Sequence, residues 1–132
     1  MSAESGTARL DGFSAVFTVA DVGAAIAYYR DRLGFRVQFA MGDPPAYAIV
    51  ERDRVSLHLM PAAQEARALG LSSIYVYVRD ADALHRALLA RGCPIEAGPE
   101  DFAYGMRELS LRDPDGNRIT FGQDISARAQ TT

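Results

Sequence analysis

The stretch FSAVFTVADVGAAIAYYRDRLG, residues 13–34, decides the fold. Its first part, Phe13–Val19, has the alternating apolar pattern of a strand. Asp21 then stands in the N-cap position, where a carboxylate accepts hydrogen bonds from the first free amides of a helix. The helical segment Val22–Leu33 carries apolar residues every three or four positions, which is the stripe of an amphipathic helix. Glycine, at Gly34, is the residue that best tolerates a left-handed helix C-cap.

The stretch SIYVYVRDADALHRALLARG, residues 73–92, repeats this order. Ser73–Val78 reads as a strand, Asp80 as the N-cap, and Ala81–Arg91 as a helix that again stops at a glycine. The two capping aspartates are 59 positions apart, since 80 minus 21 is 59. The chain therefore contains a weak internal duplication.

Three further strands are predicted after each helix. They are Phe35–Ala40, Ala46–Glu51 and Val55–Met60 in the first half, and Ile95–Ala97, Met106–Arg112 and Asn117–Gln123 in the second. Asp113-Pro114-Asp115-Gly116 indicates a tight turn, and nothing more than a turn. The sequence thus predicts one α+β domain, residues 1–132, with modules at about 12–60 and 72–123. The linker at 61–71 leaves room for a helical turn.

The amino-acid composition argues against several classes of function. The 132 residues are 48% hydrophobic and 23% charged, which is the balance of a globular protein. No apolar run approaches the roughly 20 residues of a membrane span, and Met1–Leu10 lacks a signal-peptide pattern. A net charge of −3 with interspersed signs argues against nucleic-acid binding. The single cysteine, Cys93, fits a reducing compartment, so we expect a cytoplasmic protein.

Alternation along the strands separates two faces of each sheet. One face is aliphatic and is expected to lie under the helices. The other carries hydroxyls, a histidine, methionine and tyrosines, and it is either solvated or part of a cleft. Tyr75 and Tyr77 share one face of one short strand, which favours the cleft because tyrosine combines an apolar ring with a polar tip.

Two sets of motifs resemble the vicinal oxygen chelate superfamily, which contains glyoxalase I, extradiol dioxygenases and bleomycin resistance proteins. Ser14–Asp21, Tyr28-Tyr29 and Leu33-Gly34-Phe35 resemble its opening. Ile74–Arg79 and Tyr104–Phe121 resemble the bleomycin resistance proteins in particular. The resemblance implies two βαβββ modules whose curved mixed sheets form a cleft.

The resemblance also locates the positions that hold a divalent metal in metal-dependent members. Here they are occupied by Ser14, His58, Ser73 and Thr120. One imidazole and three neutral hydroxyls make a poor donor set, since metal sites use several nitrogen, sulfur or carboxylate ligands. We therefore expect no metal, no other cofactor and no catalytic residue. Cys93 has no base that the sequence identifies and is expected to be a packing residue.

What remains is a binding cleft. In the bleomycin resistance proteins the cleft lies between two subunits and aromatic rings sandwich the drug, so the resemblance implies a homodimer. Tyr47 and Tyr104 match the sandwiching positions. The full set of predicted ligand-binding residues is Tyr47, Ile49, His58, Met60, Tyr75, Tyr77, Tyr104, Met106 and Glu108.

The interpretation that follows is a metal-free protein that sequesters a flat, aromatic and potentially cationic molecule, with bleomycin-type glycopeptides as the named candidate. Two alternatives stay open: a diverged glyoxalase- or dioxygenase-like enzyme, acting as a lyase or isomerase, and a regulatory or structural homodimer. The chain has no tryptophan and only a small acidic excess, with 17 acidic and 14 basic residues. These two features leave the identity of the ligand open.

Overall fold

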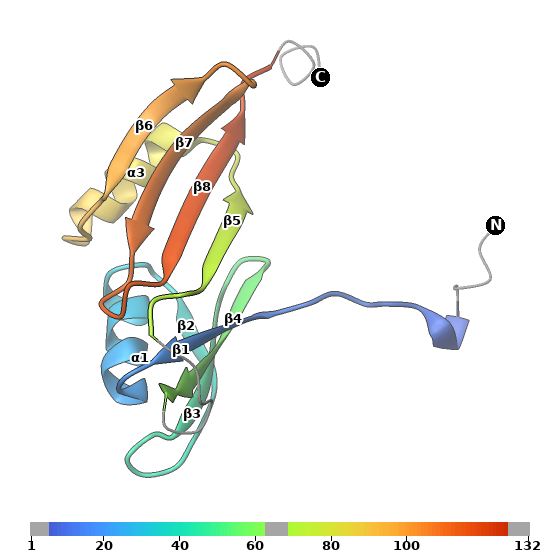
Figure 1. Ribbon diagram of the computed structural model, residues 1–132, viewed down its shortest axis with the longest axis vertical. Helices are drawn as coiled ribbons and strands as arrows, with labels where there is room; N and C mark the ends of the chain where they lie inside the picture. Colours follow the sequence, from blue (N-terminus) through green and yellow to red (C-terminus); the bar gives the residue numbers. More distant parts are fainter. Residues whose placement is uncertain (1–5, 63–68, 127–132) are drawn as a thin grey trace.

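The computed structural model describes residues 6–62 and 69–126, and it contains two similar modules (Figure 1). A short 3-10 turn, Gly6–Ala8, precedes the first module. The first module consists of β1 (Ala15–Val19), α1 (Val22–Asp31), β2 (Arg36–Met41), β3 (Tyr47–Arg52) and β4 (Val55–Pro61). The second consists of β5 (Ser73–Tyr77), α3 (Ala81–Ala90), β6 (Ala97–Phe102), β7 (Met106–Arg112) and β8 (Arg118–Asp124).

Each module folds its four strands into one mixed sheet. Sheet A has the order β1-β4-β3-β2 and sheet B the order β5-β8-β7-β6. The first strand of each module runs parallel to the last, and the other pairs are antiparallel. This arrangement confirms the predicted α+β class with two βαβββ modules.

The apolar core spans both modules. Helix α1 packs on β2, β3 and β4, and α3 packs on β6, β7 and β8. Phe17, Leu57 and Leu59 of sheet A are fully buried, and Leu111 of sheet B belongs to the same cluster. The aliphatic face of each sheet thus lies under a helix, as the alternation predicted, and burial of such side chains contributes about 1.5–3 kcal/mol each.

The helix caps follow the sequence. The Asp21 carboxylate accepts a hydrogen bond from the Ala24 amide at 3.0 Å, and the Asp80 carboxylate accepts one from Ala83 at 3.0 Å. Gly34 has a φ of 73°, the left-handed conformation expected after a helix. The helices end at Asp31 and Ala90, slightly before the predicted Leu33 and Arg91. Arg32 keeps the helical conformation as the C-cap of α1, whereas Arg91 at the end of α3 has already left it.

The C-terminal ends of the two helices meet. Arg32 donates to the Arg91 carbonyl at 2.9 Å, and Arg91 donates to the Asp31 carbonyl at 3.4 Å. A cation at a helix C-terminus interacts favourably with the helix dipole. Each helix therefore supplies the arginine that caps the other.

The prediction for β6 was wrong. The strand runs from Ala97 to Phe102 instead of Ile95–Ala97, with a register shift between Ala97 and Glu100. Gly98 sits so close to β7 that a Cβ there would lie 2.2 Å from the Glu108 carbonyl oxygen. A glycine, a proline and two acidic residues have the pattern of a loop, but an edge strand tolerates all of them.

The turn between β7 and β8 does more than reverse the chain, which corrects the expectation of a turn alone. The Asp113 carboxylate is buried and accepts the Tyr29 hydroxyl of α1 at 2.8 Å. Asn117, fully buried, donates to Asp113 at 3.0 Å and to the Thr18 carbonyl of β1 at 3.1 Å. Residues 113–117 thus form an inter-module latch that fastens module 2 to module 1.

The remaining strand boundaries lie within two residues of the predicted ones. Part of the linker, residues 63–68, lies outside the described residues, and so does the helical turn considered there. The segment before β1 runs away from the body of the molecule (Figure 1). Its apolar side chains Leu10 and Phe13 are 92% and 94% exposed.

Candidate ligand-binding site

The predicted site residues fall into two groups, one on each sheet. The first group lies on β3 and β4 of sheet A, where Ile49 pairs with His58 and so shares its face. Tyr47 and Met60 are two residues away from these partners and lie on that same face. All four are half-buried. We call them the sheet A group.

The Tyr47 hydroxyl and His58 Nδ1 are joined by a hydrogen bond. Their rings meet edge to face, with centroids 5.7 Å apart. Phe39 of β2 packs on Tyr47 at 6.1 Å between centroids. The sequence predicted a strand at Phe39 but not its contact with Tyr47. The His58 ring is therefore held in place by Tyr47, with its Nδ1 already engaged.

The second group lies on sheet B and consists of Tyr75 and Tyr77 of β5, Tyr104 of the β6–β7 turn, and Met106 and Glu108 of β7. The hydroxyls of Tyr75 and Tyr104 both donate to Glu108 Oε2, each at 2.8 Å. The sequence predicted these residues but not this convergence. We call the group the sheet B group.

The two phenols that donate to Glu108 have raised pKa values. Burial, followed by the hydrogen bond to Glu108, raises the pKa of Tyr75. The hydrogen bond to Glu108 is the largest cause that raises the pKa of Tyr104. Two hydrogen-bond donors therefore face one carboxylate oxygen at neutral and mildly alkaline pH.

Rings border this carboxylate on two sides. Tyr104 stacks on Phe102, with centroids 5.4 Å apart and planes 10° apart. Tyr75 meets Tyr77 edge to face at 5.3 Å. Tyr77 is 79% exposed and Tyr104 66%. A cluster of exposed aromatic side chains beside a carboxylate is typical of binding surfaces.

Gly122 makes room for Tyr75. A Cβ at this position of β8 would lie 1.8 Å from the Tyr75 hydroxyl oxygen. The Tyr75 side chain therefore crosses over β8 to reach Glu108 on β7, and only glycine permits the crossing. Sequence reasoning missed this residue, although a glycine inside a strand is a known signal of a close approach. Phe102 was missed because its strand was placed too early.

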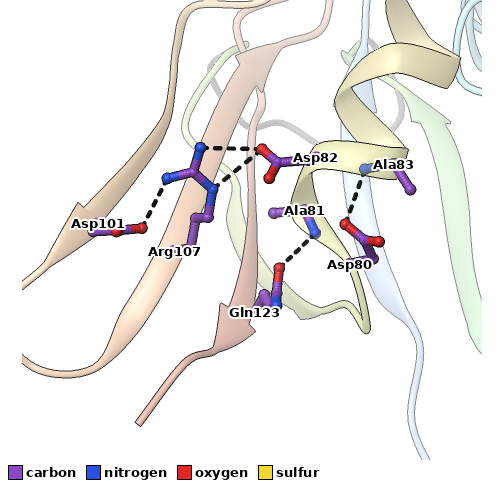
Figure 2. Close-up of polar contacts among 7 residues, drawn as sticks. All are labelled: Asp80, Ala81, Asp82, Ala83, Asp101, Arg107 and Gln123. Carbon is purple, nitrogen blue, oxygen red and sulfur yellow. Dashed lines mark hydrogen bonds and ion pairs between the residues drawn. The ribbon is translucent and has the colours of Figure 1, made fainter.

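Polar contacts fix the frame around the sheet B group (Figure 2). Arg107 of β7 binds Asp101 of β6 at 2.8 Å and Asp82 of α3 at 3.0 Å. The Gln123 side chain of β8 accepts from the Ala81 amide at 2.8 Å. Together these contacts tie α3 to β7 and β8, and β7 to β6, on the helical face of sheet B, which is opposite the face that carries Glu108.

The four positions that matched metal ligands do not form a metal site. Ser14 Oγ lies 2.5 Å from Ser56 Oγ, and His58 is engaged by Tyr47. Ser73 and Thr120 lie on the other sheet. Within residues 6–62 and 69–126 no group of three or more His, Cys, Asp or Glu side chains could hold a metal ion. Neutral hydroxyls are weak ligands for divalent metals, so this donor set does not fit one.

Within one chain the two groups stay apart. No hydrogen bond or ring contact between described residues joins the sheet A group to the sheet B group. An open hollow of about 900 Å³ lies beside His58 and is lined by Phe13, Ser14 and Arg54 among others. Each group is thus a separate cluster on the face of its own sheet.

Comparison with known proteins identifies the class. Residues 13–121 match the model of the Glyoxalase/Bleomycin resistance protein/Dioxygenase superfamily. The match covers most of the 132 residues, and the chain belongs to this superfamily. Among curated proteins no match was found.

Three crystal structures illustrate the range of similar folds. A bleomycin-binding protein from Streptomyces verticillus, in complex with copper(II)-bleomycin, is 29% identical with a TM-score of 0.65, over 86% of this chain and 95% of that one. A superfamily member from Nocardioides is 19% identical with a TM-score of 0.74, over 93% and 89%. A lactoylglutathione lyase from Agrobacterium tumefaciens is 22% identical with a TM-score of 0.70, over 86% and 92%.

The same fold thus occurs in a binding protein and in an enzyme. The similarity to the lyase is a similarity of fold alone. No helix in the described part of the chain is long and apolar enough to cross a membrane.

Proposed function

We propose that this protein binds a flat, aromatic and cationic small molecule without a metal, in a cleft that a second copy of the chain completes. The observation that carries the proposal is the convergence of Tyr75 and Tyr104 on Glu108, surrounded by exposed rings. Sequestration, rather than catalysis, is the activity that this arrangement supports.

The chemistry of the sheet B group suits a cation. Both phenols donate to Glu108 Oε2, and no described residue donates to Oε1, which is left to accept from a ligand. A cationic group placed there would also face aromatic rings, and such cation–π contacts contribute roughly 0.5–2 kcal/mol. An aromatic body could stack on the exposed face of Tyr104 or Tyr77.

The homodimer supplies the opposite wall. Each chain presents one half-site on each sheet, and the sheet A group carries the remaining predicted residues, Tyr47, Ile49, His58 and Met60. Pairing sheet A of one protomer with sheet B of its partner would bury both groups and form two equivalent clefts. We expect this dimer to be cytoplasmic, in keeping with the single Cys93, which is buried.

Bleomycin-type glycopeptides are the first ligands to test, since the Streptomyces verticillus relative is a bleomycin-binding protein of the same fold. Calorimetric titration of bleomycin should give one site per chain. Glu108→Gln keeps the shape of the side chain and removes its charge, so it should weaken binding of a cation by about tenfold or more. Glu96→Gln, at a residue that belongs to neither group, is the control.

No heat with any bleomycin-type compound would refute the named ligand. Equal binding by the wild type and Glu108→Gln would refute the role of the sheet B group.

A second candidate is the diverged enzyme, and the Tyr47–His58 hydrogen bond favours it, because a fixed imidazole is the common general acid or base. The test is formation or cleavage of lactoylglutathione, with and without added divalent metal. Turnover that His58→Gln abolishes would replace the binding proposal with an enzymatic one.

A further inference from the structure

A groove of about 600 Å³ lies between the modules, on the helical side of sheet B, and Tyr77 of the sheet B group is among its lining residues. Its apolar walls come from β5, with Ile74 and Val76, and from α3, with Leu84 and Leu88. Its end is formed by the β3–β4 turn, residues 52–55. This volume is within the range of small-molecule sites.

The internal duplication explains why the groove is open. Strand β5 lies at the edge of sheet B, and its helix-facing residues Ile74 and Val76 are only half-buried. At the offset of 59 residues, Val76 corresponds to Phe17 and Val78 to Val19. Val78 is half-buried as well, whereas Phe17 and Val19 are 0% exposed. The two modules therefore differ in how well the first strand is covered.

The difference arises from the two turns. The inter-module latch contributes five residues, 113–117, between β7 and β8, and it packs against the end of β1. The corresponding β3–β4 turn has two residues, Asp53 and Arg54. Leu88 also stands where α1 has the larger Tyr29, since 88 minus 29 is again 59. The groove therefore lies where the short β3–β4 turn provides no counterpart of the inter-module latch.

The rim of the groove carries more unsatisfied positive than negative charge. Arg54 and Arg79 line it, and neither has a hydrogen bond or ion pair with any described residue. Asp53, in contrast, lies 3.8 Å from Arg52, and Asp80 caps α3 through Ala83. An anion can therefore engage the two free guanidinium groups without displacing an existing partner.

We propose that this groove is a second ligand site, for an apolar molecule that carries one anionic group. Its apolar body lies along β5 and α3, and its anion lies between Arg54 and Arg79. Arg54 also lines the hollow beside His58, so the groove shares this one arginine with the neighbourhood of the sheet A group. Its preferred charge is the reverse of the one that Glu108 selects.

The test uses a pair of dyes with the same aromatic body. 1-Anilinonaphthalene-8-sulfonate carries a sulfonate, and N-phenyl-1-naphthylamine lacks it. The wild type should bind one sulfonate dye per chain. Arg54→Ala and Arg79→Ala should each weaken that dye by about twofold to fivefold, as exposed ion pairs do. Binding of the neutral dye should change by less than about twofold.

Two further variants sharpen the design. Arg86→Ala removes an exposed arginine of α3 that does not line the groove, and it should bind like the wild type. Ala87→Phe narrows the groove itself and should weaken both dyes. Unchanged thermal unfolding of each variant shows that the fold is intact.

Three results would overturn the proposal. An unchanged affinity for the sulfonate dye in both arginine variants would mean that the dye adsorbs nonspecifically to apolar surface. Binding lost in Tyr104→Ala would place the dye on the sheet B group. Binding that begins only after deletion of residues 1–12 would mean that the N-terminal segment of a second copy fills the groove.

Discussion

At the scale of single residues, the side chains of interest are defined by their partners. The hydroxyls of Tyr75 and Tyr104 both donate to Glu108, and the hydroxyl of Tyr29 donates to Asp113. All three phenols have raised pKa values, but the surroundings differ: Tyr29 is fully buried, whereas Tyr104 is largely exposed. The Tyr29–Asp113 bond is therefore expected to support stability, and the bonds of Tyr75 and Tyr104 to Glu108 are expected to shape a binding surface.

Tyr104 should act in binding through its ring. Tyr104→Phe keeps the stack on Phe102 and should change affinity by less than about tenfold. Tyr104→Ala removes the stacking surface and should cost about thirtyfold or more, as loss of an aromatic anchor does. The same pair of changes at Tyr47 tests the opposite wall. Calorimetry combined with thermal unfolding measures both effects, and an alanine variant that unfolds earlier yet binds normally would mean that the ring only packs.

Tyr29→Phe should destabilise the protein by about 1–3 kcal/mol at neutral pH, because buried Asp113 loses a hydrogen-bond donor. Burial and Asp113 also raise the pKa of Tyr29 well above 10.0 in the folded state. A tyrosine of the unfolded chain ionises near pH 10, so above that pH the folded state binds more protons and stability falls as pH rises.

Melting temperatures measured between about pH 9 and 11 test this pH dependence of stability. The melting temperature should decrease less steeply with pH in Tyr29→Phe than in the wild type. The control is Tyr77→Phe, which alters an exposed ring. Parallel curves for all three proteins would show that Tyr29 is not protected in the folded state.

At the scale of elements, close approach between neighbouring strands and turns decides what the half-sites look like. Gly98 lets β6 lie close against β7, and Gly122 lets Tyr75 cross β8. The five-residue turn after β7 reaches module 1, whereas the two-residue turn after β3 leaves a groove. Small changes in these connections therefore alter a surface without altering the topology.

Gly122→Ala should displace Tyr75 from Glu108, because the new Cβ would overlap the phenol oxygen. Tyr75 is 41% exposed and can swing outward, so the loss should appear in ligand affinity more than in stability. A double-mutant cycle with Tyr75→Ala measures the coupling. If the glycine acts through Tyr75, adding Gly122→Ala to Tyr75→Ala should cause no further loss. Additive losses would assign Gly122 a different role.

At the scale of the whole molecule, the two modules are fixed to each other while both half-sites face outward. The latch and the reciprocal Arg32 and Arg91 caps hold the modules together. With the modules held in this way, each half-site needs an opposite wall from elsewhere. In the proposed function, that wall is the half-site of a second copy of the chain.

We therefore expect a homodimer of about 29 kDa, twice the 14.3 kDa of one chain, with more than about 1,000 Å² buried between protomers. Sedimentation velocity at micromolar concentration measures it. Tyr77→Glu would place a charge on the paired surface and should shift the protein toward monomer, whereas Arg86→Glu, on α3, should not. A wild type that sediments only as a monomer would contradict the paired-sheet geometry.

Much of the fold follows from local sequence. Asp21 and Asp80 cap their helices through amides three residues away, and the alternation of Leu57 and Leu59 with His58 assigns the faces of β4. Such features depend on neighbours within one helical turn or one strand, so they are legible in a single segment. The internal duplication, with Asp21 and Asp80 at equivalent positions, then predicted a pair of similar α+β modules.

Other features exist only once distant segments meet. The Tyr29–Asp113 bond joins residues 84 positions apart, and the Tyr75–Glu108 bond joins residues 33 apart. The unfilled groove beside β5 depends on two turns in different modules and on the size of a side chain in α3. Side-chain periodicity and helix capping can be predicted from a local stretch of sequence, because both depend on backbone geometry. Which polar groups converge, and which apolar surface stays uncovered, depends on packing that only the tertiary structure decides.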